Sequence, residues 1–300
     1  MEYICGITSV RRLAFIYIVC YNRRIIMLCG DFMDRFVNDA DFKLIDRDRF
    51  TFNVLTRILR GECELVLSDH EKVIICHSDS KMNYPVWVWT PDDYGAEDME
   101  QAWTLVNEVR PVTEGYKYKL KHELADYFME RAEELGHEME VDTNLFAYDC
   151  PKLIAPENEV DGYLHCVTDE EVDEVIAHKL LFYECIGDSI GDRETFETNA
   201  RDKVAQRIYF FWKNAEGKAV ASCSFKVTGE LACLSGVLTL PEFRRRHYAQ
   251  NMVYALTKLL MEQGFTPMLY TDADYAASNA CYQKVGYVRR GGLCTLREKR

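Results

Sequence analysis

The chain has 300 residues, of which 36 are Lys or Arg and 49 are Asp or Glu, so its formal net charge is −13. Hydrophobic residues make up 48% and charged residues 28%, which is ordinary for a globular protein and excludes a collagen, a coiled coil or a wholly disordered chain. The length predicts roughly two domains, and the acidic balance argues against nucleic acid as a partner. A local basic pocket for a phosphorylated cofactor stays compatible with this charge.

Twelve cysteines are spread along the chain, and no two of them form a C-x-x-C pair. The ligand spacing of a zinc ribbon or redox motif is therefore absent, and no histidines form an H-E-x-x-H pattern. Thiols inside apolar, strand-like runs, such as those of Cys76, Cys223 and Cys233, behave as small hydrophobic residues. The sequence predicts a reduced, cytoplasmic protein without a metal cofactor.

Residues 1–43 are predicted to be an extension that precedes the folded domains. Their apolar run, Leu13–Tyr21, follows two arginines and is too short for a membrane helix, which needs about 20 residues. No clean small-residue cleavage site follows it, so we predict neither a signal peptide nor a membrane partner. Met27 or Met33 is an alternative start of the natural chain.

Residues 44–150 are predicted to form an N-terminal α/β domain. The predicted helices cover Phe50–Leu59 and Tyr118–Leu135, and the predicted strands cover Glu64–Leu67, Lys72–His77, Pro85–Trp89 and Asn144–Tyr148. The segment Pro151–Val160 has two prolines and several charges, so we interpret it as a linker.

Residues 160–300 are predicted to form a second α/β domain with a mixed sheet. Thr168 and Glu171 form a capping-box pattern at the start of its first helix. One predicted helix starts at that box, and three others cover Arg193–Gln206, Ala249–Gln263 and Ser278–Val285. The predicted strands cover Gly162–Cys166, Ile208–Lys213, Ala219–Val227, Leu231–Leu240 and Pro267–Thr271, followed by a hairpin over Tyr287–Leu296 that turns at Gly291-Gly292.

Three consecutive arginines, Arg244–Arg246, lie between the third antiparallel strand and the start of the longest helix of this domain. Backbone N–H groups and the positive end of the dipole at a helix N-terminus attract anions. The pattern therefore indicates a binding loop for a pyrophosphate. A solvated basic loop is the alternative that these residues alone leave open.

The segment Pro241–Ala249, after the strand GVLTL, resembles motif A of the GNAT superfamily of N-acetyltransferases. About forty residues downstream, LYTDADYAASNACYQKVGY resembles the superfamily's motif B, with Asn279, Tyr282, Gly286 and Tyr287 at the matching places. The resemblance covers about residues 160–300. It implies a GNAT-like acyltransferase fold, acetyl-CoA as co-substrate, and transfer of the acetyl group to the primary amine of a small molecule or peptide.

The resemblance also implies roles for individual residues. The splayed strand before the loop gives a backbone N–H to the oxyanion in this family, and Tyr282 matches the general acid that protonates the leaving thiolate. Asn279 matches a residue that hydrogen-bonds the pantetheine arm. The residues implied to bind the cofactor are Val237, Leu238, Thr239, Arg244, Arg245, Arg246, His247, Tyr248, Ala249 and Asn279.

One departure from the family pattern is His247, which stands where the motif has a glycine. Either this residue adopts an unusual φ or side chains replace some backbone contacts to the phosphates. The alternative function is therefore a CoA-binding regulatory or interaction module without turnover. Glu184 and Asp188 are the candidates for the general base. We interpret the following as structural residues: His165, Cys166, Phe182, Tyr183, Trp87 and Trp89.

The element order of the N-terminal domain is similar to that of the second domain but lacks an arginine-bearing loop before a helix. We therefore interpret it as a degenerate GNAT-like unit and expect no second cofactor site there. The oligomeric state does not follow from the sequence.

Overall fold

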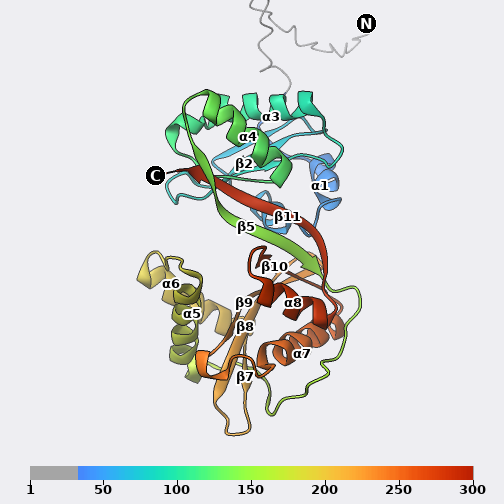
Figure 1. Ribbon diagram of the computed structural model, residues 1–300, viewed down its shortest axis with the longest axis vertical. Helices are drawn as coiled ribbons and strands as arrows, with labels where there is room; N and C mark the ends of the chain where they lie inside the picture. The colour runs from blue at the N-terminus through green and yellow to red at the C-terminus, as the bar shows by residue number, and fades with distance from the viewer. Residues whose placement is uncertain (1–32, 300) are drawn as a thin grey trace, which may run out of the picture. The chain divides into compact units, whose positions relative to one another are not determined.

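The structure, a computed structural model, describes residues 33–299. The apolar run Leu13–Tyr21 and the alternative start Met27 lie outside the described residues. Asp34–Arg300 form one compact unit of mixed α/β class, which confirms the predicted fold class (Figure 1). Within residues 33–299, no helix is long and apolar enough to cross a membrane.

The described chain alternates helices and strands throughout its length. The helices are α1 (Asp39–Asp46), α2 (Asn53–Ile58), α3 (Ala96–Val109), α4 (His122–Glu134), α5 (Val172–Ile186), α6 (Arg193–Ala205), α7 (Tyr248–Glu262) and α8 (Ala276–Val285). The strands are β1 (Leu65–Ser68), β2 (Ile74–His77), β3 (Val86–Trp89), β4 (Tyr118–Leu120), β5 (Met139–Asp149), β6 (Tyr163–Cys166), β7 (Tyr209–Lys213), β8 (Ala219–Thr228), β9 (Leu231–Thr239), β10 (Thr266–Asp272) and β11 (Val288–Glu298). Three short 3₁₀ turns complete the set: η2 (Val112–Glu114), η3 (Asp169–Glu171) and η4 (Pro241–Phe243).

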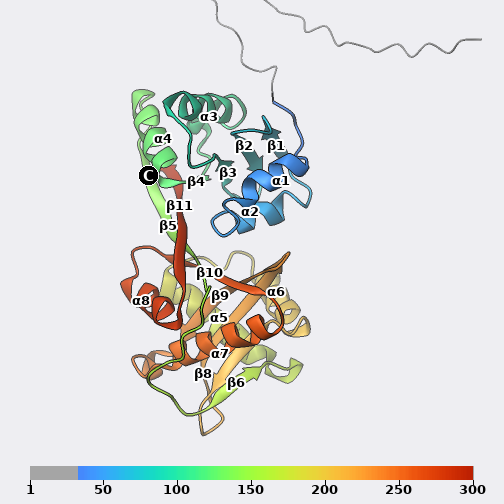
Figure 2. The same cartoon turned by 90° about the vertical axis from the view of Figure 1, so that its right-hand side faces the viewer.

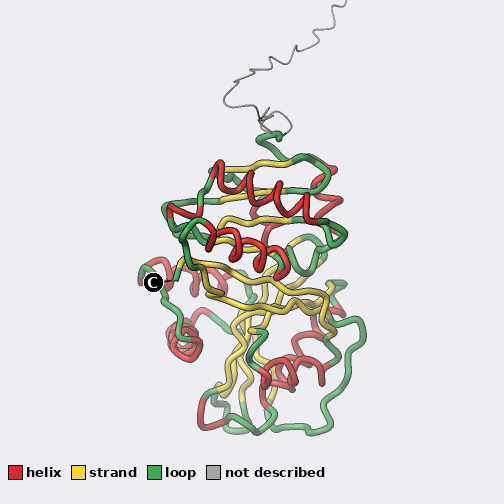
Figure 3. Tube along the Cα trace, turned by 45° about the horizontal axis from the view of Figure 1, so that its top comes forward, coloured by secondary structure: helices red, strands yellow, loops and turns green. Residues whose placement is uncertain are grey.

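The strands form one sheet of eleven, in the order β1-β2-β3-β4-β11-β5-β10-β9-β8-β7-β6 (Figure 3). Two neighbouring pairs are parallel, β3 with β4 and β9 with β10, and the other pairs are antiparallel. The two longest strands, β5 and β11, pair side by side in the middle of the sheet. β5 belongs to the first half of the chain but pairs with β10 of the second, while β11 pairs with β4 of the first. The two halves therefore exchange their last strands.

Both halves repeat one order of elements: two helices, three antiparallel strands, a helix, a strand, a helix and a strand. The first half runs α1-α2-β1-β2-β3-α3-β4-α4-β5, and the second runs α5-α6-β7-β8-β9-α7-β10-α8-β11 after the additional strand β6. In each half the third strand pairs in parallel with the fourth. The predicted similarity of the two halves is therefore present in their topology.

The second half packs helices on both faces of its part of the sheet. Figures 1 and 2 show α7 on one face and α5 on the other. The apolar stripe of α7, which includes Met252, Leu256 and Leu260, is fully buried against β8, β9 and β10. On the opposite face, α5 and α6 bury Val175 and Phe196 against β7. In the first half Trp87 and Trp89 pack under α2, as predicted for core residues.

The helix predicted over Tyr118–Leu135 starts too early. Its first three residues form β4, which pairs with β3. Tyr118 and Leu120 are buried, whereas Lys119 between them is only partly buried. The helix α4 begins only at His122. Because Tyr118 and Leu120 also fit the helical spacing of this segment, periodicity alone extended the helix across them. The helix α3 is likewise absent from the predicted elements.

The hairpin predicted at Gly291-Gly292 is wrong, because β11 runs through both glycines as one strand. A bulge between Arg289 and Gly291 is the only irregularity near them. A Cβ on Gly291 would lie 2.3 Å from Thr51 Oγ1, and one on Gly292 would lie 2.8 Å from the ring of His122. These glycines therefore allow the first half of the chain to approach β11 closely rather than making a turn.

Candidate functional site

The strands β9 and β10 separate in the middle of the second half of the sheet. They pair in parallel from Leu231 with Thr266 to Leu234 with Leu269, and then the ladder stops. Beyond that point β9 continues along β8 to Thr239, while β10 continues along β5 to Asp272. The facing edges of the two strands, including Val237, Leu238 and Thr239, have no partner strand there. A gap between two backbone edges can pair with an extended ligand.

A bulge in β9 directs this separation. Ser224 pairs with Ser235 but Ser222 pairs with Leu238, so β9 carries one residue more than β8 in this interval. Gly236 lies inside the bulge with a φ of +64°, which a residue with a side chain rarely adopts. The sequence signal for this bulge is an isolated glycine within a strand pattern.

The loop after β9 leads through η4 into α7 and places two residues in the left-handed region. Arg245 has a φ of +62° and His247 has a φ of +64°. Such reversals turn successive backbone N–H groups toward one side and form anion-binding concavities. His247 is also the N-cap of α7, and its side chain makes no capping hydrogen bond. The first N–H groups of α7, including those of Tyr248 and Ala249, therefore lack a side-chain acceptor at this cap.

The three arginines line an open depression with Pro241 and Glu242. Arg244 Nε donates to the carbonyl of Thr239 at 3.2 Å, which ties the loop to the end of β9. The guanidinium of Arg246 lies over the ring of Phe243, 5.4 Å from its centre. Among the described residues, none of the three arginines forms an ion pair. Their charges are therefore available to an anion at the start of α7.

Asn158 of the predicted linker and Asp161, just after it, hold the start of α7 in place. The Tyr248 hydroxyl donates to Asp161 Oδ1 at 2.6 Å, and this carboxylate, with a smaller effect of burial, raises the pKa of Tyr248 to about 12. Asn251 Nδ2 donates both to the carbonyl of His247 and to that of Asn158, at 3.1 and 2.9 Å. These contacts join segments far apart in sequence, so no local pattern could have identified Asp161 or Asn158.

The side-chain amide of Asn279 is hydrogen-bonded to other residues of the protein. Its Nδ2 donates to the carbonyls of Asp272 and Tyr275, at 2.8 and 3.0 Å, and its Oδ1 accepts from the Tyr148 hydroxyl at 2.9 Å. These bonds join α8 to the ends of β10 and β5. A cofactor could reach only the remaining lone pair of Oδ1 unless one of these bonds opened.

Tyr282 lies on α8 within the core between α7, α8 and the sheet, and 7% of it is exposed. Its ring packs edge-on against Tyr287, with 6.1 Å between centres. Burial raises the pKa of the Tyr282 phenol well above its ordinary value. The hydroxyl therefore keeps its proton throughout the neutral pH range, as a proton donor must.

The structure brings the end of α5 next to the arginine loop. Arg244 Nη2 lies 3.1 Å from the sulfur of Cys185, which is flanked in sequence by Glu184. Glu184 and Asp188 are exposed, and neither forms an ion pair among the described residues. His165 instead contacts Glu171 at 2.7 Å, in agreement with a structural role. No group of three metal-ligating side chains occurs in residues 33–299.

The corresponding loop of the first half, between β3 and α3, has the opposite charge. Asp92 and Asp93 lie in it, and Glu97 and Asp98 follow in the first turn of α3. Asp98 Oδ2 accepts from the N–H of the N-cap Gly95 at 2.9 Å. These carboxylates complement the helix dipole themselves and would repel a phosphate.

Comparisons with known proteins give a family-model match within the second half and several proteins of similar structure. Residues 210–295 match the FR47-like proteins, and no curated protein sequence matches the chain. A GCN5-related N-acetyltransferase from Sphaerobacter thermophilus is similar in structure, with a TM-score of 0.63 and 11% identity over 90% of this chain and 96% of its own. An acetyltransferase from the GNAT family of Colwellia psychrerythraea has a TM-score of 0.54 and 14% identity over 89% of this chain and 99% of its own.

A glucosamine N-acetyltransferase region of a fungal multi-domain β-N-acetylglucosaminidase also has a similar structure. Its TM-score is 0.50 at 12% identity, over 89% of this chain and 38% of that chain. At these identities the similarity establishes the fold, and the fold includes both halves of the chain. Residues 210–295 therefore match the FR47-like family model, and the whole chain shares its fold with these GNAT acetyltransferases.

Proposed function

We propose that this protein is an acetyl-CoA-dependent N-acetyltransferase that acetylates a primary amine. The observation that carries the proposal is the separation of β9 from β10 directly before the arginine loop. An open backbone edge and an anion-binding helix start, joined by a few residues, fit a ligand with an amide-bearing arm and a pyrophosphate. The GNAT fold of this domain supports the same ligand.

The residues present fit acetyl-CoA in two places. Arg244 and Arg246, with the N–H groups at the start of α7, would hold the pyrophosphate. The edge of β9 over Val237, Leu238 and Thr239 would pair with the amides of the pantetheine arm. The left-handed φ of His247 supports this fit, because the chain adopts the glycine-like conformation of the motif without a glycine.

When bound, acetyl-CoA supplies an acetyl group activated as a thioester. The N–H groups of the separated β9 segment are donors for an oxygen that gains negative charge. Tyr282 holds a proton on its Oη throughout the neutral pH range and is our proposed general acid. Glu184 and Asp188 are the proposed bases for the amine proton, because the end of α5 lies beside the arginine loop.

The proposed acceptor is a small amine or the amine of a peptide. The glucosamine N-acetyltransferase region with the same fold supports an amine acceptor, although its identity to this chain is only 12%. The formal net charge of −13 favours a cationic acceptor through long-range attraction.

The test is release of free thiol from acetyl-CoA across a panel of amines that includes glucosamine, polyamines and lysine-containing peptides. We expect at least one amine to raise thiol release above the rate in buffer, with the acetylated amine detected by mass spectrometry. The protein with both Arg244 and Arg246 replaced by alanine is the control and should lose this activity. Calorimetric binding of acetyl-CoA without turnover on any amine would instead favour a CoA-binding regulatory module.

A further inference from the structure

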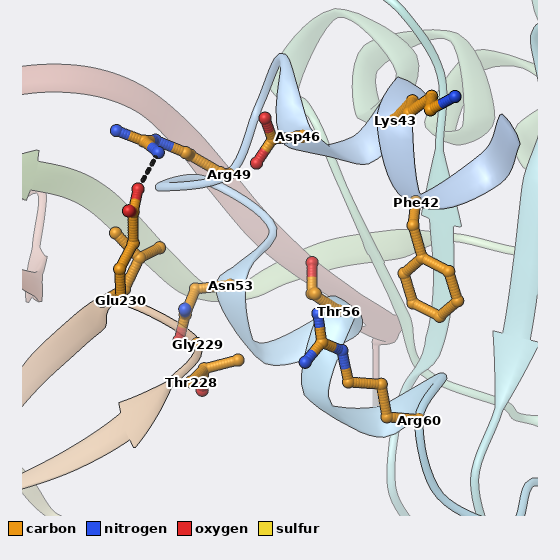
Figure 4. Close-up of a pocket in the computed structure, with 11 residues that line it drawn as sticks. Phe42, Lys43, Asp46, Arg49, Asn53, Thr56, Arg60, Thr228, Gly229 and Glu230 are labelled. Atoms are coloured by element: carbon orange, nitrogen blue, oxygen red, sulfur yellow. Dashed lines mark hydrogen bonds and ion pairs between the residues drawn. The ribbon is translucent and has the colours of Figure 1, made fainter. Parts of the chain in front are cut away.

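A cavity of about 330 Å³ lies between the first two helices and the turn that joins β8 to β9 (Figure 4). One wall comes from α1 and α2, and the other comes from Thr228–Leu231. The turn has two central residues, Gly229 and Glu230, and Gly229 has a φ of +59°. An ion pair between Arg49 and Glu230 joins the two walls at one side of the cavity. The volume is at the lower end for ligand pockets and suits a small molecule.

The amide of Asn53 is the first observation that points to a ligand. Asn53 is only 1% exposed, yet within residues 33–299 neither its Nδ2 nor its Oδ1 has a hydrogen-bond partner. The Thr228 hydroxyl, also buried, lacks a partner in the same part of the chain. Figure 4 shows the Asn53 side chain directed from α2 toward Thr228 and Gly229. Buried polar atoms without partners destabilise a protein unless something else satisfies them.

Opposite charges in the same cavity are the second observation. Asp46 on α1 and Arg60, just after α2, both line it, and within residues 33–299 neither forms an ion pair. Figure 4 shows the Arg60 and Thr56 side chains on α2 and the segment after it, with the Asp46 carboxylate across the cavity. The ring of Phe42 lies 5.6 Å from the Arg60 guanidinium and supports it. A carboxylate and a guanidinium that do not pair with each other can hold the two charges of a zwitterion.

We propose that this cavity binds a free α-amino acid. The ligand carboxylate would bind Arg60 and the Thr56 hydroxyl, its ammonium would bind Asp46, and the Asn53 amide would complete the set with one donor and one acceptor. This site is separate from the arginine loop, because Leu231 at one end of β9 lines the cavity and Thr239 at the other end precedes the loop. Nine residues of strand place these ends about 26 Å apart. The amino acid would therefore bind apart from the loop proposed to hold the pyrophosphate.

The experiment is calorimetric titration of the full-length protein with each of the twenty L-amino acids. L-alaninamide, which lacks the carboxylate, and propionate, which lacks the ammonium, are the ligand controls. We expect at least one amino acid to bind, both controls to bind at least tenfold more weakly, and saturating acetyl-CoA to leave the affinity unchanged. Failure of every amino acid to bind would overturn the proposal, as would equal binding of the controls or displacement by acetyl-CoA.

Variants test the assignment of residues. Arg60→Gln and Asp46→Asn should each weaken binding at least tenfold. Arg47→Gln is the matched control, because it removes the charge of an exposed residue at the end of α1 that does not line the cavity, and it should bind as the unaltered protein does. Asn53→Leu should abolish binding and raise the melting temperature of the free protein, since it removes unpartnered polar atoms. Equal affinities of Arg60→Gln and Arg47→Gln would contradict the proposal even if Asn53→Leu does not fold.

Discussion

His247 combines a left-handed backbone with an imidazole at the start of α7. A residue with a Cβ in this region is strained by roughly 1–2 kcal/mol relative to glycine. We predict that His247→Gly leaves the free energy of unfolding unchanged or raises it by up to about 1 kcal/mol. The same variant should bind acetyl-CoA more weakly, because the imidazole N–H replaces a donor to the phosphates.

Denaturant unfolding and calorimetric titration measure these two effects separately. His247→Asn is the control variant, since asparagine tolerates the left-handed region but lacks the ring. It should also bind acetyl-CoA more weakly. A glycine variant that binds more tightly than the unaltered protein would mean that the ring crowds the phosphates.

Tyr282 is predicted to contribute its hydroxyl proton and not only its ring. Tyr282→Phe keeps the packing on Tyr287, so acetyl-CoA affinity should barely change. Turnover should fall by about 10²–10⁴-fold, the usual contribution of a positioned acid. Because burial raises the pKa of this phenol well above its ordinary value, the rate should show no loss from its ionisation as the pH rises through 8 and 9.

The matched control for this prediction is Tyr287→Phe. Tyr287 is also buried, and its hydroxyl hydrogen-bonds Thr257 Oγ1 at 2.8 Å. Loss of the Tyr287 hydroxyl should lower the free energy of unfolding by about 1 kcal/mol, and it should slow turnover less than Tyr282→Phe does. Single-turnover rates measured with two acyl donors distinguish the roles, because a better leaving thiol needs less protonation. Unaltered rates in Tyr282→Phe would remove this residue from the mechanism.

The loop from η4 to α7 is predicted to bind the pyrophosphate as a unit. Replacing Arg244 and Arg246 together by alanine should weaken acetyl-CoA binding at least tenfold, because each provides a charge-assisted hydrogen bond. Added salt should weaken binding to the unaltered protein in the same direction. Arg193 and Arg201 of α6, which pair with Glu197 on the surface, give a double variant with the same change of charge. Equal affinities of the two double variants would show that the loop does not bind the cofactor.

A side chain at the glycines of β11 is predicted to disturb the packing between the two halves. Gly291→Ala would place a Cβ 2.3 Å from the Oγ1 of Thr51, which is only 4% exposed. The neighbours would have to move, so we expect the free energy of unfolding to fall by about 1–3 kcal/mol. Gly61→Ala is the control, because its Cβ would meet only an ordinary contact at 3.4 Å. Thermal unfolding of both variants measures the difference.

Elements with one clear period were predictable, and elements that depend on distant partners were not. The order of the second half from β6 to α8 follows from its spacing and caps, including the Thr168–Glu171 box. The three residues of β4 are too few to show a period of two, so they were absorbed into α4. The pair Gly291-Gly292 has the composition of a turn, and only contact with Thr51 explains it as strand.

The candidate site was predictable where it is continuous in the chain. The segment Arg244–Ala249 and the strand before it are local, so motif and element order located them together. The role of Gly236 can be identified only from the pairing of β9 with β8. The contact of Asp161 with Tyr248 joins residues 87 positions apart, so no local motif predicts it. The hydrogen bond from Tyr148 to Asn279 could not be predicted from a local motif either, because Tyr148 belongs to the other half of the chain.

Because the two halves exchange their last strands, β5 and β11, we expect that the second half does not fold alone. Without β5, a fragment of residues 160–300 would expose the edges of both β10 and β11, which are interior strands in the full sheet. We expect this fragment to aggregate or to lack a cooperative thermal transition, whereas the full chain unfolds in one transition. Circular dichroism during heating and size-exclusion chromatography test this. A monomeric fragment with the melting temperature of the full chain would contradict it.

The strand β11 is made after the other described strands, and it lies between β4 and β5 in the middle of the sheet. Its partner strands β4 and β5 are therefore made long before it: Asn144 of β5 pairs with Cys294, 150 positions downstream, and Tyr118 of β4 pairs with Leu296, 178 positions downstream. Contacts so distant in sequence form slowly, and unpaired strand edges are exposed until they do. The edges of β4 and β5 that face β11 therefore stay unpaired until β11 is made, and assembly of the centre of the sheet waits for this strand.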